Sequence, residues 1–308
     1  MNNFSRYLKK KKSEMFFFIK DYSLAVLRFH NRCEIVDIAT GELLTTLKVR
    51  AISEAVYCEK YNKLFLKSIL NGCVYAYSFD TEELEKIFKL AESDKGIFLS
   101  NDESKLIAYS SGNVYEINTG TNECRLIYRD EIQCFYQMGW DNLSHNCYEF
   151  VFGSNTIPKT ICQVSYNGEL LSQAVIKIDN IPMQILDISY FSELDLYIMY
   201  GAKHYLMINQ EPEDNDKELT VISKGTIGNI IYSSEHTYAG GCYYTLNYKG
   251  YLIYCCGNKN INVIDTRTLK EIKEVPLDKT ITIMQYEPLR NSLYISTGFG
   301  CEILENFL

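Results

Sequence analysis

One pattern recurs along this chain: a polar turn, an apolar run of about six residues, a short turn with Gly or Asn, and a second β-rich run. The seven apolar runs are LAVLRF (24–29), KLFLKSI (63–69), KLIAYSS (105–111), YEFVFGS (148–154), LDLYIMY (194–200), YLIYCCG (251–257) and SLYISTG (292–298). Equivalent positions in most neighbouring copies lie about forty residues apart. A strand pair of this kind cannot bury both of its faces alone, so neighbouring copies must pack against one another.

The second β-rich runs end in residues that suit tight turns. An Asp or Asn stands near the strand end in five copies, at Asp37, Asp80, Asn118, Asn167 and Asp265. Such side chains accept hydrogen bonds from the backbone of the turn and tolerate unusual φ angles. The 25 Tyr and 15 Phe residues add to the preference for strands. The repeat is therefore built from β-hairpins.

A forty-residue period with four short strands per copy is typical of a β-propeller. We predict an all-β chain, a propeller of seven four-stranded blades that forms a single domain over residues 1–308. The seventh copy stops at CEILENFL (301–308) without an outer strand, and FSRYLKKKKS (4–13) has the character of that strand. Lysines on an outermost strand would also block edge-to-edge pairing. We expect this N-terminal strand to close the ring.

Two segments carry a resemblance to a known family. VDIATGELL (36–44) and VIDTRTLKEI (263–272) share a strand, an Asp, a Thr turn and a second strand. In this the chain resembles the bacterial WD40-like and YVTN-type propellers, and the resemblance extends over nearly the whole chain at the level of architecture. It implies the propeller fold. True WD40 repeats carry a Trp-Asp pair and a Gly-His pair in their blades, whereas this sequence has one Trp-Asp pair, at Trp140-Asp141, and no Gly-His pair.

The sequence holds no pattern that commits it to a reaction. The four histidines, His30, His145, His204 and His236, lie in four different repeats. No GxSxG, P-loop or HExxH motif is present in the sequence. We therefore predict no catalytic residue, no cofactor and no metal site.

Composition indicates the surroundings of the protein. Eleven cysteines occur without CxxC pairs, which favours reduced thiols and a cytoplasmic location. The net charge of −8 disfavours contact with nucleic-acid phosphates. No run reaches the roughly 18 apolar residues of a membrane span. We expect a monomer that binds neither nucleic acid nor membrane.

The predicted fold and the missing motifs favour a non-catalytic, protein-binding scaffold, and hence a protein that is not an enzyme. Two alternatives stay open. One is a propeller enzyme of the lactonase or lyase type with an axial active site, which requires His, Glu or Arg at equivalent inner positions of several blades. The predicted inner strands offer Tyr, Cys, Ile and Met instead. The other is a binding protein that neutralises a toxin.

Two insertions indicate where a protein partner would bind. GWDNLSHN (139–146) lengthens the first hairpin of the fourth copy, and QEPEDNDKE (210–218) lies in the fifth copy. We expect both loops on one face, where an exposed tryptophan beside carboxylates would suit a basic partner. The predicted partner-binding residues are Trp140, Asp141, Glu211, Asp214 and Asp216. The alternative is that Trp140 caps the core between blades.

Overall fold

A computed structural model of the chain shows an all-β protein with one α-helix in its described part. It describes residues 3–11, 15–90, 96–110, 112–129, 136–143, 145–152, 160–175, 177–178, 181–182, 184–191, 196–202, 217–223, 231–232, 236–239, 242–248, 250–256, 260–265, 267–268, 270–277, 281–297 and 300–308. The chain divides into two compact units. Unit 1 comprises Met1–Gln133 and Ile281–Leu308, and unit 2 comprises Cys134–Thr280. Each unit is described by itself.

Unit 1 contains four antiparallel sheets, and in each the strands follow one another in chain order. Their strands are β1 (Met15–Ile19), β2 (Leu24–Phe29), β3 (Arg32–Asp37), β4 (Leu43–Leu47), β5 (Ile52–Cys58), β6 (Lys63–Ser68), β7 (Cys73–Ser78), β8 (Leu84–Lys89), β9 (Ile97–Leu99), β10 (Lys105–Ser110), β11 (Asn113–Asn118), β12 (Cys124–Arg129), β28 (Ile281–Glu287), β29 (Ser292–Thr297) and β30 (Gly300–Glu305). A 3₁₀ turn, Pro288–Arg290, joins β28 to β29. The predicted strand pairs are therefore present, each as part of a small meander.

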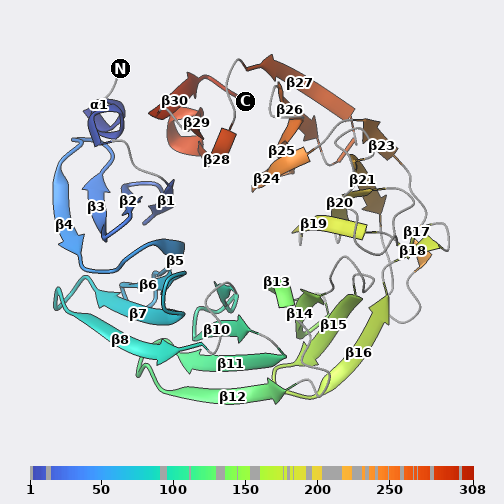
Figure 1. Ribbon diagram of the computed structural model, residues 1–308, viewed down its shortest axis with the longest axis horizontal. Coiled ribbons are helices and arrows are strands. Elements are labelled where there is room, and N and C mark those ends of the chain that lie inside the picture. The colour runs from blue at the N-terminus through green and yellow to red at the C-terminus, as the bar shows by residue number, and fades with distance from the viewer. Residues whose placement is uncertain are drawn as a thin grey trace. The chain divides into compact units, whose positions relative to one another are not determined.

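Neighbouring sheets of unit 1 meet at their first strands. β1 contacts β28 on one side and β5 on the other, and β5 contacts β9. Figure 1 shows β4, β8 and β12 on the opposite, outer side of the same sheets. Between the sheets lie apolar cores, because alternate residues of each strand point into the gap. One core joins Val26 and Ile35 to Leu64 and Leu66, and the next joins Phe65 to Leu106 and Ala108.

The predicted N-terminal strand is wrong, because residues Asn3–Lys11 form the helix α1. Phe4 and Leu8 stand one helical turn apart, and both are buried. They pack in a cluster with Leu27 and Tyr294, while Arg6 on the other side is exposed. This i, i+4 spacing suits a helix, and lysine is a good helix former, so the lysine run extends a helix instead of an edge strand.

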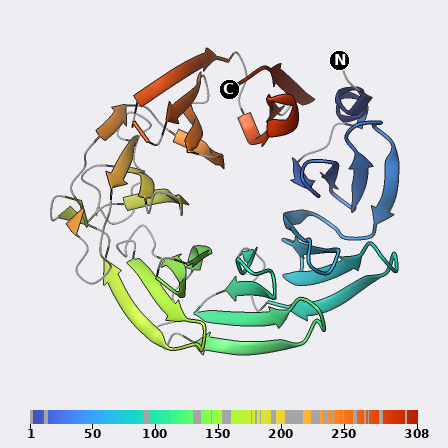
Figure 2. The ribbon, with the colours of Figure 1, turned by 180° about the vertical axis from the view of Figure 1, so that it is seen from behind.

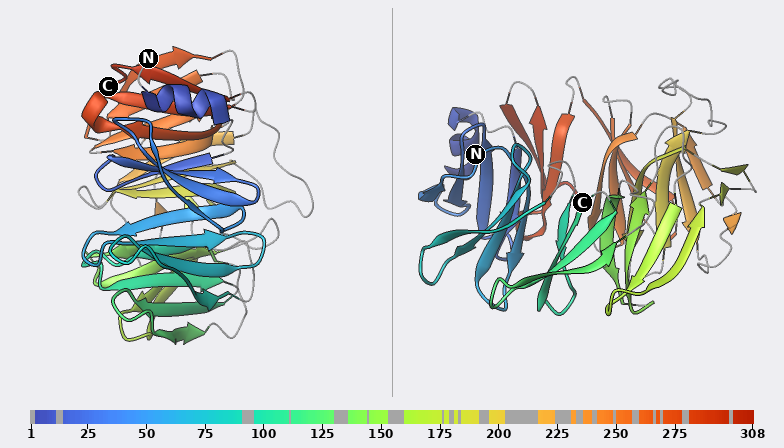
Figure 3. Two further views of the ribbon diagram at one scale, coloured as in Figure 1. Left: turned by 90° about the vertical axis from the view of Figure 1, so that its left-hand side faces the viewer. Right: turned by 60° about the horizontal axis from the view of Figure 1, so that its bottom comes forward.

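The helix lies where the missing strand was expected. α1 contacts β30, and Figure 2 and Figure 3 show it beside the C-terminal strands from two further sides. Within the described residues, β28, β29 and β30 form a three-stranded sheet. The last sheet is therefore not completed by an N-terminal strand. Instead, the N-terminal helix contacts its strand β30.

The turn residues do what the sequence predicts. The Asp37 carboxylate accepts the backbone N–H of Thr40 at 2.7 Å, and the Asn118 side chain accepts the N–H groups of Gly120 and Thr121 at 2.9 Å. Gly41 has a φ of +72° and passes so close to α1 that a Cβ there would lie 2.7 Å from the backbone of Asn3. Only glycine fits both conditions.

Unit 2 contains three further four-stranded sheets and a small three-stranded one in its described part. The larger sheets are formed by β13 (Tyr136–Asn142), β14 (Cys147–Phe152), β15 (Thr160–Ser165) and β16 (Leu170–Val175); by β19 (Gln184–Phe191), β20 (Leu196–Ala202), β21 (Lys217–Ser223) and β23 (His236–Ala239); and by β24 (Cys242–Tyr248), β25 (Tyr251–Cys256), β26 (Asn260–Asp265) and β27 (Lys270–Pro276). The small sheet holds β17 (Lys177–Ile178), β18 (Ile181–Pro182) and β22 (Ile231–Tyr232). Among the described residues of the chain, no helix is long and apolar enough to cross a membrane.

Candidate functional site

A β-bulge in unit 1 places two polar side chains against one lysine. In the β5–β6 pair, Ile52 is opposite Ser68 and Glu54 is opposite Lys67, so Ser53 is the extra residue on β5. A bulge bends its strand and re-aims the side chains around it. Ser53 and Glu54 therefore both lie beside Lys67 of β6. They belong to β5, the first strand of the sheet, where neighbouring sheets meet.

Lys67 is a buried cation. The residue is only 1% exposed, and its Nζ donates a hydrogen bond to Ser53 Oγ at 3.3 Å. A buried ammonium is costly unless an opposite charge offsets it. Glu54 is its cross-strand neighbour and interacts with it electrostatically.

Glu54 is held from the next sheet. Its Oε2 accepts the backbone N–H of Ile97 on β9 at 2.5 Å. Burial raises the pKa of the Glu54 carboxyl to about 7, although the Lys67 charge and the hydrogen bond from Ile97 pull the pKa down. A carboxyl with a pKa near neutrality is present in both protonation states at physiological pH. It can therefore accept or donate a proton there.

Polar residues recur at one position of the second strands of unit 1. The fifth residues of β2, β6, β10 and β29 are Arg28, Lys67, Tyr109 and Ser296. These strands lie in four sheets that follow one another through contacts of their first strands. An axial active site was expected to need His, Glu or Arg at equivalent inner positions of several blades, and of these four equivalent residues only Arg28 is of that kind.

The arrangement can combine a base with a cation. Glu54 can take a proton, and Lys67 can stabilise negative charge that develops beside it. In the part of the chain that the structure describes, no three His, Cys, Asp or Glu residues gather as a metal site would require.

A second polar cluster lies in unit 2, in the β13–β16 sheet. Trp140, Glu149, Gln163 and Ser172 stand opposite one another across the four strands. The Trp140 indole N–H donates to Glu149 Oε2 at 2.9 Å, and the Gln163 amide donates to Glu149 Oε1 at 2.8 Å. Ser172 in turn donates to Gln163 Oε1 at 2.8 Å. These bonds satisfy the fully buried Glu149.

His145 adjoins this row. Its Nδ1 lies 3.1 Å from Glu149 Oε1 and 3.0 Å from the Asn142 amide nitrogen. A histidine oriented by a carboxylate has the arrangement of a general base, but the same contacts also stabilise the β13–β14 hairpin. The Glu149 carboxylate beside it accepts two further N–H groups, from Trp140 and Gln163.

The predicted partner-binding residues are only partly brought together. Trp140 is half-buried and its N–H is used by Glu149. Asp141 accepts the hydroxyl of Tyr166 at 2.7 Å. Glu211, Asp214 and Asp216 lie outside the described residues. The proposed face around Trp140 therefore stays a prediction.

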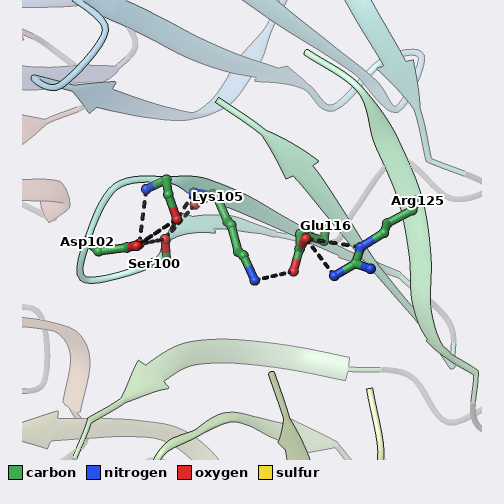
Figure 4. Close-up of polar contacts among 6 residues, drawn as sticks. Ser100, Asp102, Lys105, Glu116 and Arg125 are labelled. Atoms are coloured by element: carbon green, nitrogen blue, oxygen red, sulfur yellow. Dashed lines mark hydrogen bonds and ion pairs between the residues drawn. The ribbon is translucent and has the colours of Figure 1, made fainter. Parts of the chain in front are cut away.

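Other polar contacts have a structural role. Figure 4 shows the Glu116 carboxylate between Lys105 and Arg125, at 2.8 and 2.9 Å, and Asp102 within the β9–β10 turn. The Arg125 side chain is 63% exposed, and exposed ion pairs stabilise a fold only weakly. This group ties strands β10, β11 and β12 together.

Two of the described cysteines are poor nucleophiles. Six are free, at positions 33, 58, 73, 124, 147 and 162. Burial raises the pKa of Cys33 and of Cys147 to about 12. Since the thiolate is the reactive form, these two thiols are inert at neutral pH.

Sequence reasoning missed Glu54, Lys67 and the His145–Glu149 pair. The available signal was a charge inside an apolar run: Glu54 in ISEAVYC, Lys67 in KLFLKS and Glu149 in CYEFVF. A charged residue on an otherwise buried strand face must have a partner.

No family model matches the chain, and no curated protein matches it. Among solved structures, Kuenenia stuttgartiensis hydrazine synthase is similar with a TM-score of 0.72 and 14% identity over 94% of each chain. A streptogramin B lyase structure is similar with a TM-score of 0.65 and 10% identity over 94% of this chain and 92% of that one. The dihydro-heme d1 dehydrogenase NirN has a TM-score of 0.58 and 11% identity over 86% of this chain and 57% of that one.

These similarities correct one prediction. The chain was expected not to be an enzyme, because its fold was taken to indicate a binding scaffold. All three structures are enzymes with this fold, so that inference is wrong. At identities of 10 to 14%, what the structures share with this chain is the fold, which is all-β and of the β-propeller type.

Proposed function

We propose that this protein is an enzyme that transfers protons with Glu54 and stabilises an anionic intermediate with Lys67. The observation that carries the proposal is a carboxyl whose pKa lies at about 7, opposite a buried ammonium. Perturbed titratable groups with a specific charge partner occur preferentially at functional sites. A purely structural ion pair would instead keep its carboxylate well ionised.

The chemistry fits bond cleavage of the lactonase or lyase type. Such reactions begin with removal of a proton, from water or from carbon, and build negative charge on an oxygen of the substrate. Glu54 has a proton-accepting carboxyl, and Lys67 has an ammonium beside it. The similarity to a streptogramin B lyase supports this class of reaction as a starting point.

We further propose that the protein is a propeller of seven blades. The described residues form six four-stranded sheets and the three-stranded β28–β30 sheet. Each sheet is a meander, as in a propeller blade. The one exception is the sheet in which β21 pairs with β23, because β22 belongs to the small sheet. In the last blade α1 takes the place beside β30, so the chain ends are joined by a helix instead of a strand. Glu54 then lies on the innermost strand of its blade, β5, and Lys67 on the next strand, β6.

A second candidate function is the binding of a basic protein at Trp140 and Asp141. Trp140 is half-buried and fixed by its bond to Glu149, and a rigid aromatic side chain beside a carboxylate is a common binding anchor. This surface would serve an enzyme as a place for a regulator or a second subunit.

The test compares the turnover of Glu54→Gln with that of the native protein. The substrates are a panel of neutral esters, lactones and carbonyl compounds that carry a leaving group on the carbon β to the carbonyl. Glu59→Gln serves as the matched control, because Glu59 is an exposed residue just after the same strand. We expect E54Q to lose turnover by about 100-fold or more and E59Q to retain it. Absence of any Glu54-dependent turnover across the panel would refute the proposal.

A further inference from the structure

Ser110 is a buried hydroxyl without an evident structural task. It is 0% exposed at the end of β10, and its Oγ has no hydrogen-bond partner among the residues that the structure describes. The equivalent residue of the preceding sheet, Ser68, is also buried but donates to the Arg50 carbonyl at 2.8 Å. Buried polar groups are nearly always paired, so an orphaned one needs an explanation.

Strand alternation gives the direction in which Ser110 points. Leu106, Ala108 and Ser110 share one face of β10. Leu106 and Ala108 pack in the core between the β5–β8 and β9–β12 sheets, together with Phe65. Phe65 and Lys67 share one face of β6. Ser110 and Lys67 therefore stand on the two sides of the same gap, each one pleat beyond its apolar core.

Glu54 belongs to the same end of this gap. Its carboxylate is bound to the N–H of Ile97, and Ile97 is the register partner of Ala108. Ser110 follows Ala108 by two residues, a distance of about 7 Å along a strand. Val56, on the same side of β5 as Glu54, packs against the core that contains Ala108. Glu54, Lys67 and Ser110 thus border the same end of one gap between two sheets.

We propose that Ser110 Oγ–H, together with the Lys67 ammonium, binds the carbonyl oxygen of an ester or lactone substrate. This inference rests on the proposed function and names its substrate class. Two donors directed at one oxygen, with a base beside them, stabilise the oxyanion that forms during attack on an acyl group. Ser110 is then a catalytic residue, and its hydroxyl is satisfied by the substrate.

The reaction is a balanced hydrolysis. Glu54 takes a proton from water while the water oxygen forms a bond to the carbonyl carbon, and the carbonyl π electrons move to oxygen. The oxyanion accepts hydrogen bonds from Ser110 and Lys67. When the carbonyl re-forms, the bond to the alcohol oxygen breaks, and that oxygen receives the proton from Glu54. The products are a carboxylic acid and an alcohol, which remain one molecule if the substrate is a lactone.

The experiment compares Ser110→Ala and the volume-matched Ser110→Cys with Ser68→Ala. The probes are 4-nitrophenyl acetate and dihydrocoumarin, and thermal unfolding is measured in parallel. We expect S110A and S110C to unfold at or above the native temperature, because no hydrogen bond is lost. S68A should unfold at a lower temperature. Both Ser110 variants should lose about 100-fold in kcat, with little change in KM.

Each alternative result has a distinct meaning. If E54Q abolishes turnover while S110A retains it, the role of Ser110 is wrong and the proposed function stands. If E54Q retains turnover, the proposed function itself is wrong. Lower unfolding temperatures for both Ser110 variants would show a structural hydroxyl and overturn the inference. So would an acyl group trapped on Ser110 in the mass spectrum, because the residue would then be a nucleophile. If the native protein hydrolyses neither probe while eliminating a leaving group from another carbonyl compound, the ester class is wrong.

Discussion

Replacing Glu54 by Gln should change how stability depends on pH. Burial raises the pKa of this carboxyl from 4.5 to about 7. Between these values the folded chain keeps a proton that the unfolded chain has released. Stability from this group is therefore fully present below pH 4.5 and is lost as the pH rises through 7. At 1.36 kcal/mol per pKa unit, the loss amounts to about 3 kcal/mol.

The assay is urea unfolding followed by circular dichroism at a series of pH values from 4.5 to 8.5. All other titrating groups are common to the native protein and E54Q, so they cancel in the difference of the two curves. The free energy of unfolding of the native protein should fall by about 3 kcal/mol more than that of E54Q. E54Q also removes the charge that interacts with Lys67, which changes the level of stability as well. The test is therefore the slope of the free energy of unfolding with pH, and not its level.

A parallel course of the two curves would refute the reasoning. It would mean that the Glu54 carboxyl is hydrated and titrates as it does in the unfolded chain. E59Q is the control, because Glu59 is an exposed residue just after the same strand.

Three further predictions concern the supports of the fold. Phe4→Ala should lower the free energy of unfolding by about 3–5 kcal/mol, and exposed Arg6→Ala should leave the melting temperature unchanged. Gly41→Ala should cost about 1–2 kcal/mol for the left-handed backbone alone, and more if α1 has to move; an unchanged melting temperature would contradict the close approach. Glu149→Gln should cost about 1–3 kcal/mol and shift the emission of Trp140, the one tryptophan of the chain, while an unaltered spectrum would contradict their hydrogen bond.

The repeat made most of the fold predictable. Hairpins with Asp37 and Asn118 at their turns form as expected, because a side-chain acceptor at a strand end acts locally. The outer strand at residues 4–13 was not found. Its lysines were taken as edge protection, but the i, i+4 pair of Phe4 and Leu8 decided the outcome, since a helix can bury both against β30 and its neighbours.

The candidate site was much less predictable. Its residues come from two sheets, and the bulge at Ser53 that brings Glu54 to Lys67 leaves no mark in the spacing of the sequence. The Glu in ISEAVYC indicates a charge that needs a partner, but the sequence does not show which residue that partner is. What distinguishes it is the neighbouring sheet, where the Ile97 N–H meets the carboxylate. Long-range packing of this kind is set by the tertiary structure.

The central claim is that Glu54 is the acid–base group of an enzyme, and the pH dependence of kcat/KM tests it most directly. With the substrate of the panel that is turned over fastest, the native rate should rise about tenfold per pH unit below 7 and level off above it. E54Q should be slower by about 100-fold or more and should lack that rise. A native profile without an inflection near pH 7, or an E54Q profile that coincides with the native one, would contradict the account.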